Sequence, residues 1–272
     1  ISPRRTERTA MARYVLLISY DGTHFSGSQR QRGERTVQSV LEAAAEKVFG
    51  APVRAALSGR TDAGVHAAGQ VCHLDGTTSV PPHKLREAFN RFLPDDLKVL
   101  GSALAPEGFD CTRGAKRKTY CYRFYSAPCT LPLLERYAVR VEGSPDLAKM
   151  EGTCPLFVGE HDFAAFRATG SSAKTTVRTI YALSVDRKTA YGGTMYEVRV
   201  TGNGFLYNMV RILAGELYAL ATGKAKEEDV RAAFETGKRS LLYKTMPAKG
   251  LTLERVEYEI PVFPLHTETE ER

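Results

Sequence analysis

The chain has 272 residues and a formal net charge of +7 at pH 7, from 38 Lys and Arg against 31 Asp and Glu. Hydrophobic residues make up 43% and charged residues 25%, which excludes a mostly disordered chain and leaves enough apolar side chains for a sizeable core. No uncharged apolar run approaches the roughly 20 residues of a membrane-spanning helix. The basic excess is compatible with a polyanionic partner and does not establish one.

The cysteines and histidines give no pattern of metal binding. There are five cysteines, an odd number, and no two of them form a C-x-x-C pair. This argues against a disulfide framework and against a zinc site. The six histidines also lack metal-ligand spacing. We therefore expect free thiols, a reducing cytoplasmic location and no metal.

The first part of the chain predicts alternating strands and helices. Residues 1–12 are polar and basic, and we expect a disordered N-terminal extension. Residues 13–20 and 69–75 read as strands. Thr36 is a suitable N-cap for a helix to residue 49, which Gly50 ends. A second amphipathic helix is predicted over 82–93, before Pro94.

The second part begins with a basic stretch and a strand around residues 118–124 that has one aromatic face. Further strands are predicted over 177–186, 195–201 and 251–260, and helices over 206–222 and 227–236. Residues 265–272 form an acidic tail. The order of elements indicates an α+β fold with a mostly antiparallel sheet. We expect a duplicated arrangement with an N-terminal half, 13–110, and a C-terminal half, 111–264.

The most informative segment is the loop over residues 57–67, where Arg60, Asp62 and His66 stand among small residues. Glycine and alanine at its other positions would let a ligand approach the backbone. Arg60 and Asp62 are two residues apart, so in an extended segment their side chains point the same way. A carboxylate kept ionised by an arginine suits a nucleophile. The alternative is a glycine-rich turn with a surface ion pair, and the pattern alone favours that alternative.

Two other segments could contribute to a site. Tyr120 and Tyr122 stand among cations, and such rings can stack on unpaired bases while the cations bind phosphate. The alternative is a half-buried strand whose tyrosines pack in the core. Arg211 lies between Val210 and Ile212 on an otherwise apolar helix, where a charge is usually paired or functional. The alternative for Arg211 is a side chain that extends from the edge of the apolar face to water.

These segments together resemble the TruA family of tRNA pseudouridine synthases. The family's catalytic loop is similar to Gly59-Arg60-Thr61-Asp62-Ala63-Gly64-Val65-His66-Ala67, and its aromatic strand is similar to Lys118-x-Tyr120-x-Tyr122. Further matches are Tyr20-Asp21-Gly22-Thr23, Gly204-Phe205-Leu206-Tyr207-x-Met209-Val210-Arg211 and Pro247-Ala248-x-Gly250-Leu251. The matches run in order from residue 20 to about residue 258, over nearly the whole chain.

The resemblance implies a fold and an activity. The expected fold is that of the pseudouridine synthases, with two similar α/β halves, a mostly antiparallel sheet and a central cleft. The expected activity is isomerisation of uridine to pseudouridine at positions 38, 39 and 40 of the tRNA anticodon stem-loop. By this analogy Asp62 is the nucleophile and Arg211 pairs with it. Tyr120 is expected to stack on the target base or also to assist removal of the final proton from carbon. Arg60 is expected to hold the backbone of the flipped nucleotide or to fill the gap that it leaves. His66 is expected to bind substrate, and no step needs a metal or another cofactor.

The resemblance also implies tRNA, through its anticodon arm, as the partner and a homodimer as the assembly. The residues expected to contact phosphate are Arg30, Arg32, Arg35, Arg113, Lys116 and Arg117. For each of these cations, the alternative of a solvated surface charge explains its presence about as well as a phosphate contact does. Three alternative functions remain open: a related synthase that acts on other RNA uridines, a non-catalytic RNA-binding protein, and an N-glycoside hydrolase. The last would need a second carboxylate, and the loop contains none.

Overall fold

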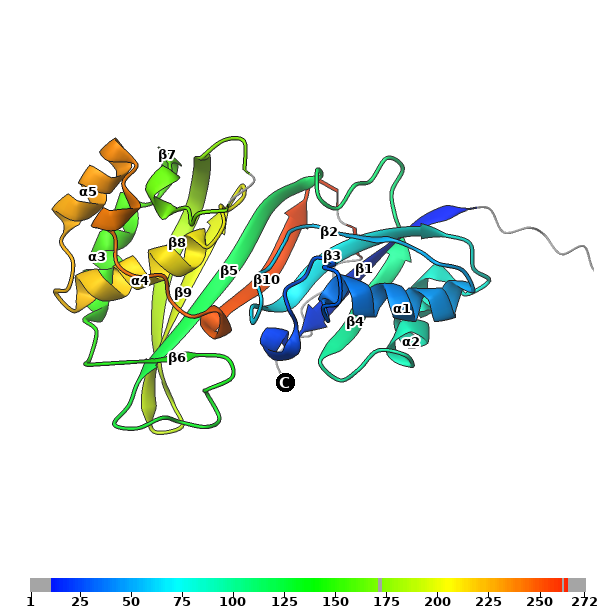
Figure 1. Ribbon diagram of the computed structural model, residues 1–272, viewed down its shortest axis with the longest axis horizontal. Helices are drawn as coiled ribbons and strands as arrows, with labels where there is room; N and C mark the ends of the chain where they lie inside the picture. Colours follow the sequence, from blue (N-terminus) through cyan, green and yellow to red (C-terminus); the bar gives the residue numbers. More distant parts are fainter. Residues whose placement is uncertain (1–10, 171–172, 261, 264–272) are drawn as a thin grey trace, which may run out of the picture.

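The computed structural model of the chain describes residues 11–170, 173–260 and 262–263 (Figure 1). In that part of the chain, ten strands form one sheet, whose main path runs β4-β1-β3-β10-β5-β9-β8-β7. The N-terminal part supplies β1 (Ala12–Tyr20), β2 (Ala55–Leu57), β3 (His66–Gly76) and β4 (Leu97–Leu104). The C-terminal part supplies β5 (Ala115–Ser126), β6 (Val139–Val141), β7 (Gly159–Asp162), β8 (Val177–Ala190), β9 (Gly193–Gly202) and β10 (Leu251–Tyr258). Neighbours pair antiparallel except β3 with β10 and β5 with β6, so the predicted α+β class is confirmed.

The helices lie in two groups at the two ends of the sheet, as Figure 1 shows. One group holds α1 (Val37–Phe49) and α2 (Leu85–Asn90). The other holds α3 (Leu147–Thr153), α4 (Met209–Ala221) and α5 (Glu227–Thr236). The expected boundary near residue 110 falls in the connection from β4 to β5. Because β10 pairs with both β3 and β5, this last strand joins the N-terminal strands and the C-terminal strands into one sheet.

Local signals explain α1, the helix that precedes the loop over residues 57–67. The Thr36 side chain accepts from the Ser39 N–H, and the Ser39 side chain accepts from the Thr36 N–H, so the predicted cap is confirmed as a capping box. Gly50 ends α1 in the left-handed conformation, with φ of 70°. These two signals fix α1 in the sequence.

Other boundaries differ from the sequence prediction. The predicted helix 82–93 is a 3₁₀ turn followed by the short α2, because the Asn90 side chain bonds both backbone groups of Val99 at 2.8 Å and leads the chain into β4. β1 begins at Ala12, inside the extension predicted for residues 1–12, while residues 1–10 and the acidic tail 265–272 lie outside the described residues. The elements β2, β4, β6, β7 and α3 were not predicted.

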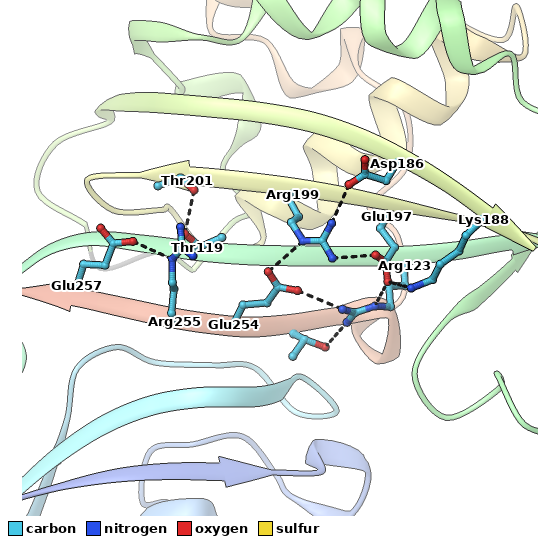
Figure 2. Close-up of polar contacts among 11 residues, drawn as sticks. Thr119, Arg123, Asp186, Lys188, Glu197, Arg199, Thr201, Glu254, Arg255 and Glu257 are labelled. Atoms are coloured by element: carbon cyan, nitrogen blue, oxygen red, sulfur yellow. Dashed lines mark hydrogen bonds and ion pairs between the residues drawn. The ribbon is translucent and has the colours of Figure 1, made fainter. Parts of the chain in front are cut away.

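The two faces of the sheet differ around β5. On one face Tyr122 and Phe124 are fully buried, and the Phe124 ring lies 6.0 Å from the Tyr218 ring of α4. On the other face arginines and acids from β5, β8, β9 and β10 form a network of ion pairs (Figure 2). Strand alternation therefore divides β5 into an apolar face under α4 and a charged face.

Candidate active site

A cavity of about 610 Å³ is lined by segments from both the N-terminal and the C-terminal part of the chain. Gly170, Ala173 and Leu251 line part of it, and most of its walls come from four other segments of the chain. They are the loop before α1 (26–29 and 31), the loop before β3 (59–63 and 65), β5 (118 and 120) and the start of α4 (205–210). The cavity therefore contains the predicted nucleophile Asp62 together with Arg60 and Tyr120.

Backbone contacts fix the loop that carries Asp62. Ser28 and Thr61 exchange hydrogen bonds, since the Ser28 N–H donates to the Thr61 carbonyl at 3.0 Å and the Thr61 N–H donates to Ser28 Oγ at 2.8 Å. The buried Tyr20 hydroxyl lies 2.8 Å from Thr61 Oγ1. Gly22 passes so close to the Val65 carbonyl that a Cβ at residue 22 would lie 2.0 Å from its oxygen. Only glycine fits at residue 22, so the segment 20–28 and the loop 61–65 hold each other in place.

Asp62 is paired with Arg211 across 149 positions of sequence. Arg211 Nη1 donates to Asp62 Oδ2 at 3.2 Å. Arg211 itself is held from behind, because Nε donates to the Met246 carbonyl at 2.7 Å. In the described part of the chain Asp62 Oδ1 has no hydrogen-bond partner, so one carboxylate oxygen remains available. The contact between these two residues, which the family resemblance implied, is present in the structure.

Two effects oppose each other at Asp62. Burial raises the pKa of the carboxyl, and the charge and hydrogen bond of Arg211 lower it, with a net rise above the ordinary 3.8. The side chain is 28% exposed, so the carboxyl keeps contact with the cavity. This environment gives a carboxylate that has lost part of its hydration and is held by one cation. Such a group can act on a bound ligand as a nucleophile or base.

β5 provides an aromatic and a cationic side chain to the same cavity. Tyr120 is 7% exposed and packs edge-on against Phe205, with ring centroids 5.3 Å apart. Two residues earlier, Lys118 Nζ donates to the Ser58 carbonyl at 2.7 Å. Burial lowers the pKa of Lys118. The wall thus offers a ring, a cation and a carboxylate around one space.

Known proteins with the same sequence pattern are tRNA-modifying enzymes. A family model described as tRNA pseudouridine synthase matches residues 16–111 and 154–259. A protein of Syntrophotalea carbinolica named tRNA pseudouridine synthase A is 44% identical over 243 residues, which cover 89% of this chain and 95% of that protein. A protein of Ruminiclostridium cellulolyticum with the same name is 39% identical over 248 residues, which cover 91% of this chain and all of that protein. The chain belongs to the tRNA pseudouridine synthase family.

The family assignment confirms the resemblance predicted from the sequence and makes this protein an isomerase that acts on uridine in tRNA. A crystal structure of a Cbf5–Nop10–Gar1 complex aligns with 81% of this chain and 56% of the matched chain, at 13% identity and a TM-score of 0.32. The assignment therefore rests on the sequence relatives.

Two residues of the family motif lie differently from what the sequence suggested. Arg60 lines the cavity and is exposed, but no ion pair joins it to Asp62 within the described residues, where Arg211 is the partner instead. His66 is 3% exposed and does not line the cavity. Its Nδ1 accepts the Gly22 N–H at 3.0 Å, and its Nε2 lies 3.2 Å from the Lys249 carbonyl oxygen. His66 thus connects three segments behind the loop.

The cations expected to contact phosphate are mostly paired with acids or rings. The partners are Glu42 for Arg30, Asp96 for Arg35, Asp110 for Arg113 and Glu259 for Lys116. The Arg117 guanidinium lies 4.9 Å from the centre of the Tyr181 ring, and alternation along β5 places it on the face opposite Lys118. Arg32 is exposed. The structure therefore does not gather these six side chains around the cavity.

The sequence prediction gave no site role to several polar residues that line the cavity, among them Lys118 and Asn208. Lys118 could have been found from alternation, since it stands two residues before Tyr120 on the same strand face. Asn208 could have been found from helix spacing, since it stands three residues before Arg211. Within the described residues, no group of three or more His, Cys, Asp or Glu could hold a metal ion, and no helix is long and apolar enough to cross a membrane.

Proposed function

We propose that this protein converts uridines 38, 39 and 40 of the tRNA anticodon stem-loop to pseudouridine, with Asp62 as the nucleophile. The observation that carries the proposal is the Asp62–Arg211 pair in the wall of a cavity beside Tyr120. Asp62 Oδ2 is held by Arg211, which leaves Oδ1 to act on the nucleotide. The family relationship supplies the reaction class, and the geometry supports the residue roles.

The reaction conserves all atoms of the nucleotide. The bond between N1 of uracil and C1′ of ribose breaks, and a bond between C5 and C1′ forms. The proton on C5 is lost, and N1 gains a proton. The base must also turn within the site between these events. A confined cavity with a carboxylate at one wall and a ring at another suits this sequence, because the detached base must be retained.

Tyr120 serves as the platform for the target base. Burial raises the pKa of its phenol well above the ordinary 10.0, and the nearby Tyr20 and Asp62 raise it further. The phenol therefore stays protonated at neutral pH. A protonated ring can stack on uracil and donate a hydrogen bond, whereas removal of the C5 proton would require its ionised form. We assign stacking to Tyr120 on this ground.

Substrate access requires a flipped nucleotide. A base in a stem-loop must leave the stack to reach Asp62, and unstacking costs a few kcal/mol that backbone contacts offset. Arg60 lines the cavity with an exposed guanidinium, which suits a contact to the flipped nucleotide. The proposed phosphate contacts are the exposed Arg32 and five cations that would exchange their present partners for phosphate. These five are Arg30, Arg35, Arg113, Lys116 and Arg117. His66 would support substrate binding indirectly, through the loop.

We extend the proposal to assembly and location. The resemblance to the TruA family supports a homodimer that grips one tRNA, which light scattering of the purified protein would test. Cys72, Cys111, Cys121 and Cys154 are buried and free, which supports a reducing cytoplasmic compartment.

The test is a base-by-base map of pseudouridine in an unmodified tRNA transcript incubated with the protein. Asp62→Asn should abolish the product. The matched control is Asp95→Asn, the same change at a fully exposed side chain, which should leave the product unchanged. Pseudouridine confined to other positions would replace the anticodon-arm assignment. Free uracil as the product would favour an N-glycoside hydrolase, and binding without any product would favour a non-catalytic RNA-binding protein.

A further inference from the structure

Asn208 has an unusual backbone conformation at the edge of the cavity. Its φ of 62° and ψ of 5° place it in the left-handed region, and it immediately precedes α4. In the described part of the chain, one other non-glycine residue, Tyr191, has a positive φ. Asparagine tolerates this conformation better than most residues, and strained backbone tends to occur at functional sites. The position therefore calls for a reason beyond the start of a helix.

The Asn208 side chain does not cap α4. No hydrogen bond joins it to the first backbone N–H groups of the helix, and the Ile212 N–H donates instead to the Asn208 carbonyl at 3.0 Å. Its Oδ1 accepts a 2.6 Å hydrogen bond from Arg211 Nη1. An asparagine in the N-cap position usually supports the helix. Here its side chain serves Arg211.

Arg211 Nη1 has two hydrogens and two acceptors. One acceptor is Asn208 Oδ1 at 2.6 Å and the other is Asp62 Oδ2 at 3.2 Å. With Nε on the Met246 carbonyl at 2.7 Å, the guanidinium is fixed at two points besides Asp62. Both fixed points are neutral, so the positive charge of Arg211 has a single carboxylate partner within the described residues.

We propose that Asn208 is a positioning residue for the isomerisation: its side-chain oxygen orients Arg211 toward Asp62, and its neutrality leaves the charge of Arg211 to Asp62. The proposal rests on Asp62 as the nucleophile. An aspartate at position 208 would accept the same hydrogen bond and compete for the charge. A glycine there would keep the backbone conformation and lose the hydrogen bond.

Other charged or titratable groups also face Asp62. The cavity walls bring in Arg60 from the same loop, Lys118 and Tyr120 from β5, and Tyr207 from the start of α4, in addition to Arg211. None of these is altered by a change at residue 208. A shift in the pH dependence of the reaction on substitution of Asn208 alone would therefore report the Arg211–Asp62 interaction.

The experiment measures single-turnover pseudouridine formation against pH, with enzyme in excess over tRNA transcript. For Asn208→Asp we expect a rate about tenfold lower at pH 7, and an acid limb about one pH unit higher than that of the wild type. For Asn208→Gly we expect a rate about tenfold lower, without the shift of the acid limb. The matched control is Asn203→Asp, which adds the same charge five residues earlier in the same segment, where Oδ1 accepts from the Thr179 N–H. It should keep the wild-type pH profile.

Stability separates a positioning role from a purely structural one. A carboxylate before the first turn of a helix is favourable, so Asn208→Asp should unfold at the same temperature as the wild type or higher while its rate falls. A wild-type rate and pH profile in Asn208→Asp would overturn the proposal. The proposal would also be overturned if both variants lost thermal stability to an extent that accounts for their lower rates. Asp62→Asn tests the proposed function itself. Full activity of that variant would show that Asp62 is not the nucleophile, whatever the Asn208 variants show.

Discussion

Two carboxylates of this protein, Asp62 in the cavity and Glu197 on the charged face of the sheet, are both paired with arginine, but their pKa values shift in opposite directions. Burial raises the pKa of both. At Glu197, hydrogen bonds from Lys188, Arg123 and Arg199 outweigh burial and lower the pKa to about 2. At Asp62, Arg211 does not outweigh burial, and the pKa is raised.

The difference lies in the number of donors. Glu197 Oε1 accepts from Arg123 and Lys188, both at 2.8 Å, and Oε2 accepts from Arg199 at 2.8 Å (Figure 2). Both oxygens of Glu197 are therefore occupied. Asp62 has one donor within the described residues, and its side chain lines the cavity. A carboxylate with both oxygens hydrogen-bonded to cations stabilises the fold, whereas one with an oxygen left unbonded can react.

The largest effect on stability should come from breaking the Glu197 network. Glu197→Gln leaves Arg123 and Arg199 beside a neutral group, and we expect the free energy of unfolding to fall by about 3 kcal/mol. Urea unfolding measures this change. Per folded molecule, pseudouridine formation should stay within about twofold of the wild type, because Glu197 does not line the cavity. An equal loss of activity and stability would show that the network also shapes the site.

The stability contributed by Glu197 depends on pH in a defined direction. Because its pKa falls from 4.5 to about 2 on folding, the contribution is complete above the unfolded value of 4.5. It is then lost as the pH falls toward about 2. The gap in unfolding free energy between the wild type and Glu197→Gln should therefore narrow below pH 4.5. A gap that is constant from pH 7 to pH 3 would assign the loss to packing instead.

The next effect is on the chemistry of the cavity. Arg211→Lys keeps one positive charge but cannot reproduce donors to Met246, Asn208 and Asp62 from one planar group. We expect the single-turnover rate to fall at least tenfold, with little change in tRNA affinity. Arg231→Lys is the matched control, since Arg231 is exposed on α5 and pairs with Glu227 of the same helix. A tenfold loss of tRNA affinity, with an unchanged rate in the bound complex, would place Arg211 in substrate binding.

Asp21 extends the comparison to a carboxylate whose partner can lose its charge. His66 Nδ1 lies 3.2 Å from Asp21 Oδ1, and burial lowers the pKa of His66 below 6.5 although Asp21 opposes the shift. A histidine with a lowered pKa resists protonation in the folded state, so stability is lost as the pH falls below 6.5. His66→Asn keeps an acceptor for the Gly22 N–H and cannot titrate. We expect a smaller loss of thermal stability between pH 7 and pH 5 in this variant, and an equal loss would attribute the pH dependence to other groups.

The sequence predicted those parts of the fold and site that depend on neighbouring residues. The N-cap at Thr36, the stop at Gly50 and α5 with its acidic first turn follow from local chemistry. The Glu197 network could not be predicted, because it depends on the register that places β5, β9 and β10 side by side. The same holds for the partner of Asp62. Spacing suggested Arg60, two residues away, and the fold supplies Arg211 instead, while the family resemblance predicted that pair.

The smallest predicted effect has the opposite sign from that of Glu197. Because the pKa of Asp62 is raised on folding, its ionised form costs stability at neutral pH, and the cost disappears as the pH falls through the raised pKa toward the ordinary 3.8. Asp62→Asn removes the charge while Arg211 keeps Met246 and Asn208 as acceptors. We therefore expect the free energy of unfolding at pH 7 to rise by less than about 1 kcal/mol while activity is lost. A clear loss of stability would instead show that this pair, like Glu197 and its arginines, holds the fold together.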